Sequence, residues 1–100
     1  MFRQGDVLLI EVNEIPNDAT PVKRESGKII LAYGEVTGHH HAIAAPQVKM
    51  LQLQDNRYLD SATSFSITHE EHATVKVPAG KFQVIIQREY SPQEIRNVLD

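Results

Sequence analysis

Histidine is the residue type in this chain best suited to chemistry, and its five copies fall in two short segments. The first segment contains His39, His40 and His41, and the second contains His69 and His72. Neutral imidazole binds borderline transition metals such as zinc, iron, copper, nickel and manganese. Because the sequence contains no cysteine, any further ligand must be another histidine or a carboxylate. The two segments therefore predict a metal site.

The first segment would present its histidines alternately if it lies on a strand. His39 and His41 would then point to one face of the sheet, while His40 points to the other. A same-face pair of imidazoles provides half of the ligands that a tetrahedral ion needs. We predict that His39 and His41 share one divalent transition metal, with zinc and iron as the best candidates.

The second segment, His69-Glu70-Glu71-His72, offers both imidazoles and carboxylates. Its histidines are three residues apart, whereas the helical zinc-protease motif places them four apart. On a regular strand His69 and His72 would face opposite ways, so both could bind one ion only if the backbone turns there. We expect at least one of them to complete the site. Glu70 or Glu71 would be the general base of an enzyme, and Asp60 is a further candidate to orient the ligands.

The elements that must position these residues are short runs of β-branched and aliphatic residues separated by turn formers. A tight hairpin is expected around residues 54–56. The expected strands are residues 6–12, 28–33, 35–44, 48–53, 57–59, 64–68, 73–77 and 82–88.

The last two of these strands are predicted to form a hairpin. We favour the register with Val77 opposite Phe82 and Val75 opposite Val84, because it gathers apolar side chains on one face. The alternative register places Val77 opposite Lys81 and mixes apolar with polar residues.

The C-terminal residues carry a helix signal. Ser91 can act as the N-cap, Pro92 occupies the first helical position and Glu94 completes a capping box. The whole pattern predicts an all-β fold, a small barrel or sandwich of about six to eight short strands with a short C-terminal helix. With 100 residues, the chain is expected to form one domain, 1–100.

Composition limits the classes of partner. The hydrophobic fraction of 41% is sufficient for a folded core, and the net charge is −3 with scattered basic residues. Such a distribution argues against nucleic acid as a partner. Arg3 and Asp6 interrupt any N-terminal apolar run, and no apolar stretch reaches the length of a membrane span, so a cytoplasmic location without membrane contact is expected. A small-molecule ligand and a homo-oligomer both remain open.

Several motifs resemble a family of small bacterial proteins whose biochemical role is not defined. They are RQGDVLL at residues 3–9, GEVTGHHHAI at 34–43 and HEEHATVKVPAGKFQVIIQREYSP at 69–92. A weaker resemblance is to the cupins, whose first motif places an HxH pair after a glycine. Here His39 and His41 follow Gly34, but no glutamate follows at the cupin distance and the segment after Gly80 lacks the second-motif histidine. The cupin resemblance implies a β-barrel with the metal inside.

Three functions are consistent with these observations. The first is a histidine-rich metal-binding β-domain with no assigned reaction. The second is a metal-dependent, cupin-like enzyme acting on a small molecule, in which an open position on the ion binds water or substrate. The third is a non-enzymatic protein-interaction module without a metal. Whether the chain is an enzyme is left open by the sequence.

Overall fold

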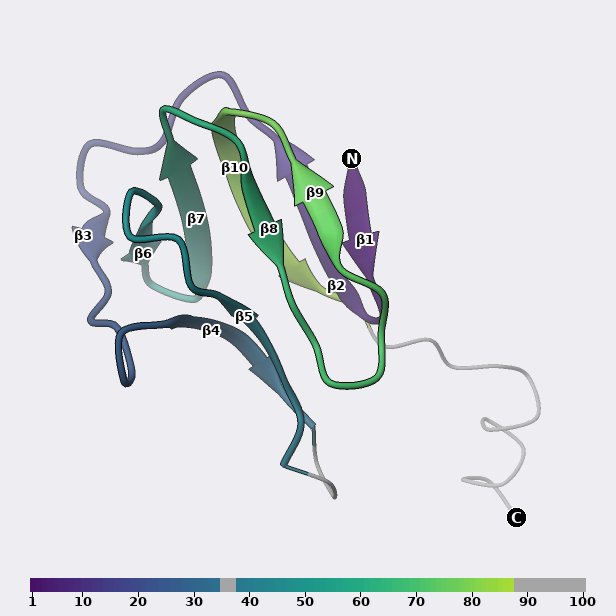
Figure 1. Ribbon diagram of the computed structural model, residues 1–100. Helices are drawn as coiled ribbons and strands as arrows, with labels where there is room; N and C mark the ends of the chain where they lie inside the picture. The colour runs from purple at the N-terminus through teal and green to yellow at the C-terminus, as the bar shows by residue number, and fades with distance from the viewer. Residues whose placement is uncertain (35–37, 88–100) are drawn as a thin grey trace, which may run out of the picture.

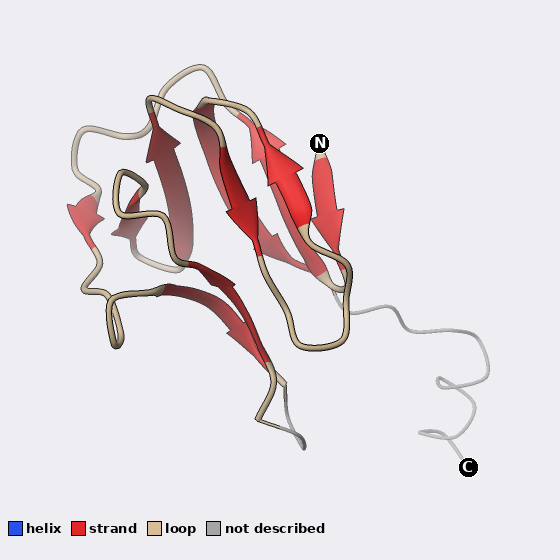
Figure 2. Ribbon diagram, in the orientation of Figure 1, coloured by secondary structure: helices blue, strands red, loops and turns tan. Residues whose placement is uncertain are grey.

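The computed structural model describes residues 1–34 and 38–87, which form ten strands and no helix. Figure 2 shows strands and loops throughout this part of the chain. The strands are β1 (Phe2–Gln4), β2 (Val7–Glu11), β3 (Thr20–Pro21), β4 (Ile29–Tyr33), β5 (His40–Ile43), β6 (Lys49–Leu53), β7 (Asn56–Ser61), β8 (Phe65–Ile67), β9 (Val75–Val77) and β10 (Gly80–Ile86). The all-β prediction is confirmed.

Six of these strands form one antiparallel sheet in the order β1-β2-β10-β7-β6-β3. β1 and β3 lie at its two ends, so this sheet does not close on itself. The barrel that the sequence left open is therefore not found among the described strands.

The remaining four strands lie over one face of the large sheet, as Figure 1 shows. β4 pairs with β5, and β8 pairs with β9, in both cases antiparallel. Ala42 on β5 and Thr68 just after β8 join the two pairs through reciprocal backbone hydrogen bonds of 3.0 and 2.9 Å. This bridge places the first histidine segment beside the second.

The core lies between the two layers, because each strand turns alternate apolar side chains inward. Phe82 on β10 is 1% exposed and packs edge-on against Phe2 and Phe65, with ring centres 5.9 and 6.1 Å away. The buried cluster contains Val7, Leu9, Ile29, Leu31, Ile43, Val48, Met50, Leu59, Phe65, Ile67, Val77, Phe82 and Val84. Both layers contribute residues to this cluster, so the described strands form two layers packed around one core.

The expected tight hairpin is present between β6 and β7. Leu53 pairs with Asn56, which leaves a two-residue turn at Gln54 and Asp55. Gln54 adopts a positive φ of 54°, as tight turns of this length require.

The expected final hairpin is wrong in both registers. β9 pairs with β8, and β10 pairs with β2 and β7, so Val77 lies opposite neither Phe82 nor Lys81. The segment between β9 and β10 crosses from one layer to the other. Val77, Phe82 and Val84 are nevertheless buried in one core, because facing layers bury the same alternating residues that a hairpin would place side by side.

The predicted C-terminal helix, with Ser91, Pro92 and Glu94, lies outside the described residues and stays a prediction. Within 1–34 and 38–87, no helix is long and apolar enough to cross a membrane.

Candidate metal centre

Three histidines from two separate segments converge at one end of the layer formed by β4, β5, β8 and β9. His41 comes from β5, and His69 and His72 come from the loop between β8 and β9. One ligand nitrogen from each lies within 4.8 Å of the other two. Exposure increases across the set: His41 is buried, His69 is half-buried and His72 is exposed. The set therefore reaches from the interior to solvent.

The loop brings both of its histidines together because the backbone turns between them. The Nδ1 atom of His69 accepts hydrogen bonds from the backbone N–H groups of Glu71 and His72, at 3.0 and 3.2 Å. These bonds fold the loop back, and the ring centres of His69 and His72 lie 4.5 Å apart. This is the turn that the three-residue spacing required.

His41 is held in one tautomer by Gln4, a buried side chain on β1. The amide nitrogen of Gln4 donates to the carbonyls of Ile67 and Ala73, both at 2.9 Å. The amide oxygen must then be the atom that lies 2.8 Å from His41 Nδ1, and an oxygen can only accept. His41 therefore carries its proton on Nδ1 and leaves the Nε2 lone pair available to a metal.

The surroundings of His41 also keep it neutral. Burial lowers the pKa of His41 below its ordinary 6.5, and the neighbouring His69 lowers it further. The Asp6 carboxylate, whose oxygen lies 3.5 Å from His41 Nε2, acts in the opposite direction on this pKa. A neutral imidazole is the form that binds metal, so His41 is ready to act as a ligand near neutral pH.

Gly5 lets the β1–β2 turn approach the imidazoles closely. A Cβ atom at this position would lie 2.8 Å from His72 Nε2 and 3.2 Å from His41 Cε1. Gly5 also has a φ of +59°, a conformation that side-chain-bearing residues rarely adopt. Both observations explain why glycine occupies this position.

His39 and His40 lie next to the cluster but are not among its three members. The His39 ring centre is 5.8 Å from that of His69, and its Nδ1 lies 3.3 Å from a carboxylate oxygen of Glu71. His40 faces Glu70, which accepts a 2.9 Å hydrogen bond from the His40 backbone N–H. Of the expected pair His39 and His41, the structure brings only His41 into the three-nitrogen set.

Two of the carboxylates that were predicted to assist the site contact the histidines next to it. The backbone N–H of His40 lowers the pKa of Glu70, so Glu70 acts as an anionic brace for the first histidine segment. Glu70 and Glu71 both stay candidate bases. Asp60 lies on β7, opposite Lys49 and Lys81 of the flanking strands, and the orienting role expected for it belongs to Gln4 instead.

The three histidines differ in how readily they could bind an ion. Two ligands of one tetrahedral ion lie about 3.4 Å apart, whereas these ligand atoms lie within 4.8 Å of one another, so the cluster would have to contract by up to about 1.4 Å. His72 is exposed on a loop and can make that adjustment. His69 accepts two backbone N–H groups at Nδ1 and so carries its proton on Nε2. Binding an ion through either nitrogen would cost these two hydrogen bonds, which makes His69 the least favourable of the three.

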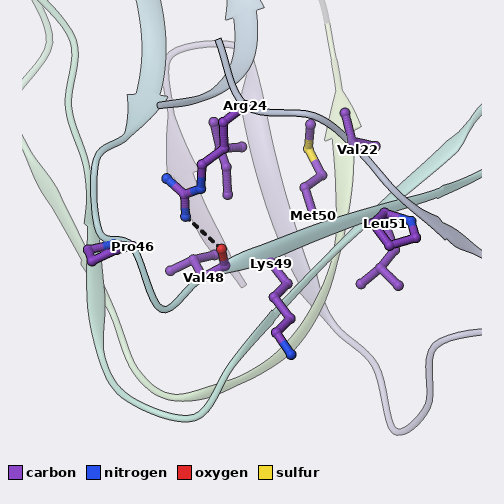
Figure 3. Close-up of a pocket in the computed structure, with 9 residues that line it drawn as sticks. Val22, Arg24, Pro46, Val48, Lys49, Met50 and Leu51 are labelled. Atoms are coloured by element: carbon purple, nitrogen blue, oxygen red, sulfur yellow. Dashed lines mark hydrogen bonds between the residues drawn. The ribbon is translucent and has the colours of Figure 1, made fainter. Parts of the chain in front are cut away.

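A hollow elsewhere in the fold has a different chemical lining. It has a volume of about 210 Å³ and is lined by Pro21, Val22, Arg24, Ile29, Pro46, Val48, Lys49, Met50 and Leu51. Figure 3 shows the Arg24 guanidinium directed at the Val48 carbonyl, with a hydrogen bond of 2.7 Å. Arg24 also donates to the carbonyls of Gly27 and Ala45, so it connects backbone segments here. No histidine or carboxylate lines this hollow.

Sequence reasoning missed Gln4, Gly5 and the approach of Asp6. Their only sequence signal is the RQGD opening, a Gly-Asp pair between two strands that is typical of a turn. Nothing in the spacing indicates that this turn contacts residues 41 and 72.

Comparison with known proteins provides a family and no activity. No curated protein and no solved structure shows significant similarity to the chain. A family model described as a domain of unknown function matches residues 3–87, a range that includes Gln4, Gly5, Asp6 and all five histidines. The chain therefore belongs to the family of the Domain of unknown function (DUF8820).

Proposed function

We propose that this domain binds one divalent transition-metal ion through His41, His69 and His72, with zinc or iron as the best-fitting metals. The observation that carries the proposal is the convergence of three imidazole nitrogens within 4.8 Å. His41 lies on β5, which pairs with β4, and His69 and His72 lie in the loop between the paired strands β8 and β9, so two separate segments must meet to bring the nitrogens together.

Three further properties support metal binding over a simple polar cluster. Gln4 leaves His41 Nε2 unprotonated, and burial keeps the ring neutral. The neighbouring His69 and His72 lower the pKa of His41 as well, which keeps the lone pair of its Nε2 atom available to a metal cation. Imidazole donors without thiolates suit zinc and iron.

Zinc titration of tag-free protein tests the proposal. We expect one ion per chain, and His41→Ala should abolish stoichiometric binding because it removes the buried, pre-oriented ligand. His40→Ala is the matched control, since it removes a neighbouring imidazole outside the three-nitrogen set. Equal zinc content in the wild type and His41→Ala, or loss only in His40→Ala, would contradict the assignment.

Thermal unfolding provides a second readout of the same binding. An ion that binds only the folded chain stabilises it by RT ln(1 + [L]/Kd), which is about 2.7 kcal/mol when free zinc exceeds Kd by 100-fold. The wild type and His40→Ala should therefore melt at a higher temperature with zinc, and His41→Ala should not.

A further inference from the structure

The β1–β2 turn contacts the histidine cluster through three consecutive residues, and the last of them carries a carboxylate. Gln4 orients His41, and Gly5 lies against His72. Asp6 places an Oδ1 atom 3.5 Å from His41 Nε2. Carboxylate oxygen is an established ligand of zinc and iron alongside imidazole.

We propose that Asp6 is the fourth ligand of the ion, which completes a three-nitrogen, one-oxygen set with His41, His69 and His72. This inference rests on the proposed function and adds to it the residue that fills the remaining coordination position.

The separation of Asp6 from His41 fits this role. Asp6 is not in the set whose ligand atoms all lie within 4.8 Å of one another, so its carboxylate would have to move closer to the loop histidines when an ion binds. With metal–ligand bonds of about 2.0–2.1 Å, neighbouring ligand atoms of a tetrahedral ion lie about 3.4 Å apart. Asp6 Oδ1 and His41 Nε2, at 3.5 Å, already have nearly that spacing. The nitrogen concerned is the one that the Gln4 hydrogen bond leaves without a proton. A cation could therefore bind between Asp6 Oδ1 and His41 Nε2 and replace the weak contact that these two atoms make.

The fixed backbone around Asp6 keeps the carboxylate at this place. The Asp6 carbonyl accepts a 2.7 Å hydrogen bond from the Gln87 N–H, and β2 begins at the next residue. The side chain is 43% exposed, so it can rotate by the small amount that coordination requires. Glu70 and Glu71, the other carboxylates nearby, contact His40 and His39 instead.

Four protein ligands would give the ion a structural or sensory role. A tetrahedral ion with four protein ligands has no position left for water, whereas catalytic zinc keeps one open. The ion would cross-link the β1–β2 turn, β5 and the β8–β9 loop, which are far apart in the sequence. This outcome favours the metal-binding domain over the metal-dependent enzyme.

Zinc affinity of Asp6→Asn tests the fourth ligand. The substitution keeps the side-chain size and removes the charge. We expect zinc to bind roughly 100-fold more weakly. Even the loss of a group that only orients a ligand lowers metal affinity by about 10- to 100-fold. Asp55→Asn, which removes the same charge from the exposed β6–β7 turn, is the matched control and should bind as the wild type does.

Cobalt(II) substitution provides a readout that does not depend on affinity. If Asp6 is a ligand, the visible spectrum of the cobalt-loaded wild type should not change with pH above neutrality. In Asp6→Ala a water molecule should replace the carboxylate on the metal. Metal-bound water ionises at about pH 7, so the spectrum of this variant should change near that pH. A water ionisation already present in the wild type would overturn the proposal.

The two proposals fail in different ways. If the wild type and Asp6→Asn bind zinc equally while His41→Ala does not, only the fourth ligand is wrong. If the wild type binds no zinc at all, the metal site itself is wrong.

Discussion

The interior between the two layers and the histidine cluster at the β1–β2 turn are stabilised by different contacts. In the interior, strands from both layers bury alternate apolar side chains in one core. In the cluster, a turn, one strand residue and one loop depend on a few hydrogen bonds, in which Gln4 Oε1 accepts from His41 and His69 Nδ1 accepts from the Glu71 N–H. We therefore expect substitutions in the interior to lower the stability of the fold, and substitutions in the cluster to weaken metal binding.

Phe82→Ala should have the largest effect on stability. Phe82 is 1% exposed and contacts aromatic rings of both layers, so its removal leaves a cavity. We expect the free energy of unfolding to fall by about 3–5 kcal/mol. Urea denaturation measures this change. A loss below 1 kcal/mol would show that the two layers do not pack as described.

Gln4→Met should affect both regions, because Gln4 connects the cluster to the fold. The change preserves size but leaves the Ile67 and Ala73 carbonyls and His41 Nδ1 without their partner. We expect a stability loss of about 1–3 kcal/mol and weaker zinc binding. The control is Gln83→Met on β10, which removes an exposed hydrogen bond from Gln83 to Asn56 on β7. If the two variants changed zinc affinity equally, the Gln4 hydrogen bond to His41 Nδ1 would not be what prepares His41 to bind the metal.

Gly5→Ala should cost less, and a matched glycine separates its two causes. Gly5 and Gly27 both have positive φ, so alanine at either position costs about 1–2 kcal/mol in backbone strain. Only at position 5 would the new Cβ lie 2.8 Å from His72 Nε2 and 3.2 Å from His41 Cε1, so the exposed His72 ring would have to shift. Gly5→Ala should therefore destabilise more than Gly27→Ala and should alone weaken zinc binding. If both variants bind zinc like the wild type, the turn does not shape the site.

The pH dependence of the metal-free protein should show the smallest effect. The folded-state pKa of His41 is lowered below 6.5, so the unfolded chain binds a proton more readily than the folded chain does. Stability from this group is therefore present above about pH 6.5 and is lost as pH falls, by at most about 1.4 kcal/mol per pH unit. Urea denaturation with a chelator present should show a weaker acid loss in His41→Asn than in the wild type. Parallel curves for the two proteins would contradict the buried, neutral His41.

Strand positions and burial could be predicted from the sequence, because alternation and turn residues are local signals. Phe65 and Ile67, at alternate positions of the expected strand 64–68, are both buried. The partners of β9 and β10 could not be predicted, since an apolar strand satisfies the same pattern beside its neighbour or across the core.

The site was predictable only in part for a related reason. Residue type and clustering indicated the histidines, because few residue types bind transition metals. Gln4 and Asp6 contribute through contacts with residues 41, 67 and 73, and no local pattern encodes such long-range contacts. A buried glutamine on a three-residue strand reads in sequence like any exposed polar residue.

The most direct test of the central claim is anomalous X-ray diffraction at the zinc edge from crystals of the zinc-loaded wild-type protein. We predict one strong peak at about 2.0–2.1 Å from His41 Nε2 and from one ring nitrogen each of His69 and His72. A peak bound instead by His39 or His40 with Glu70 or Glu71, and remote from His41, would contradict the three-histidine site.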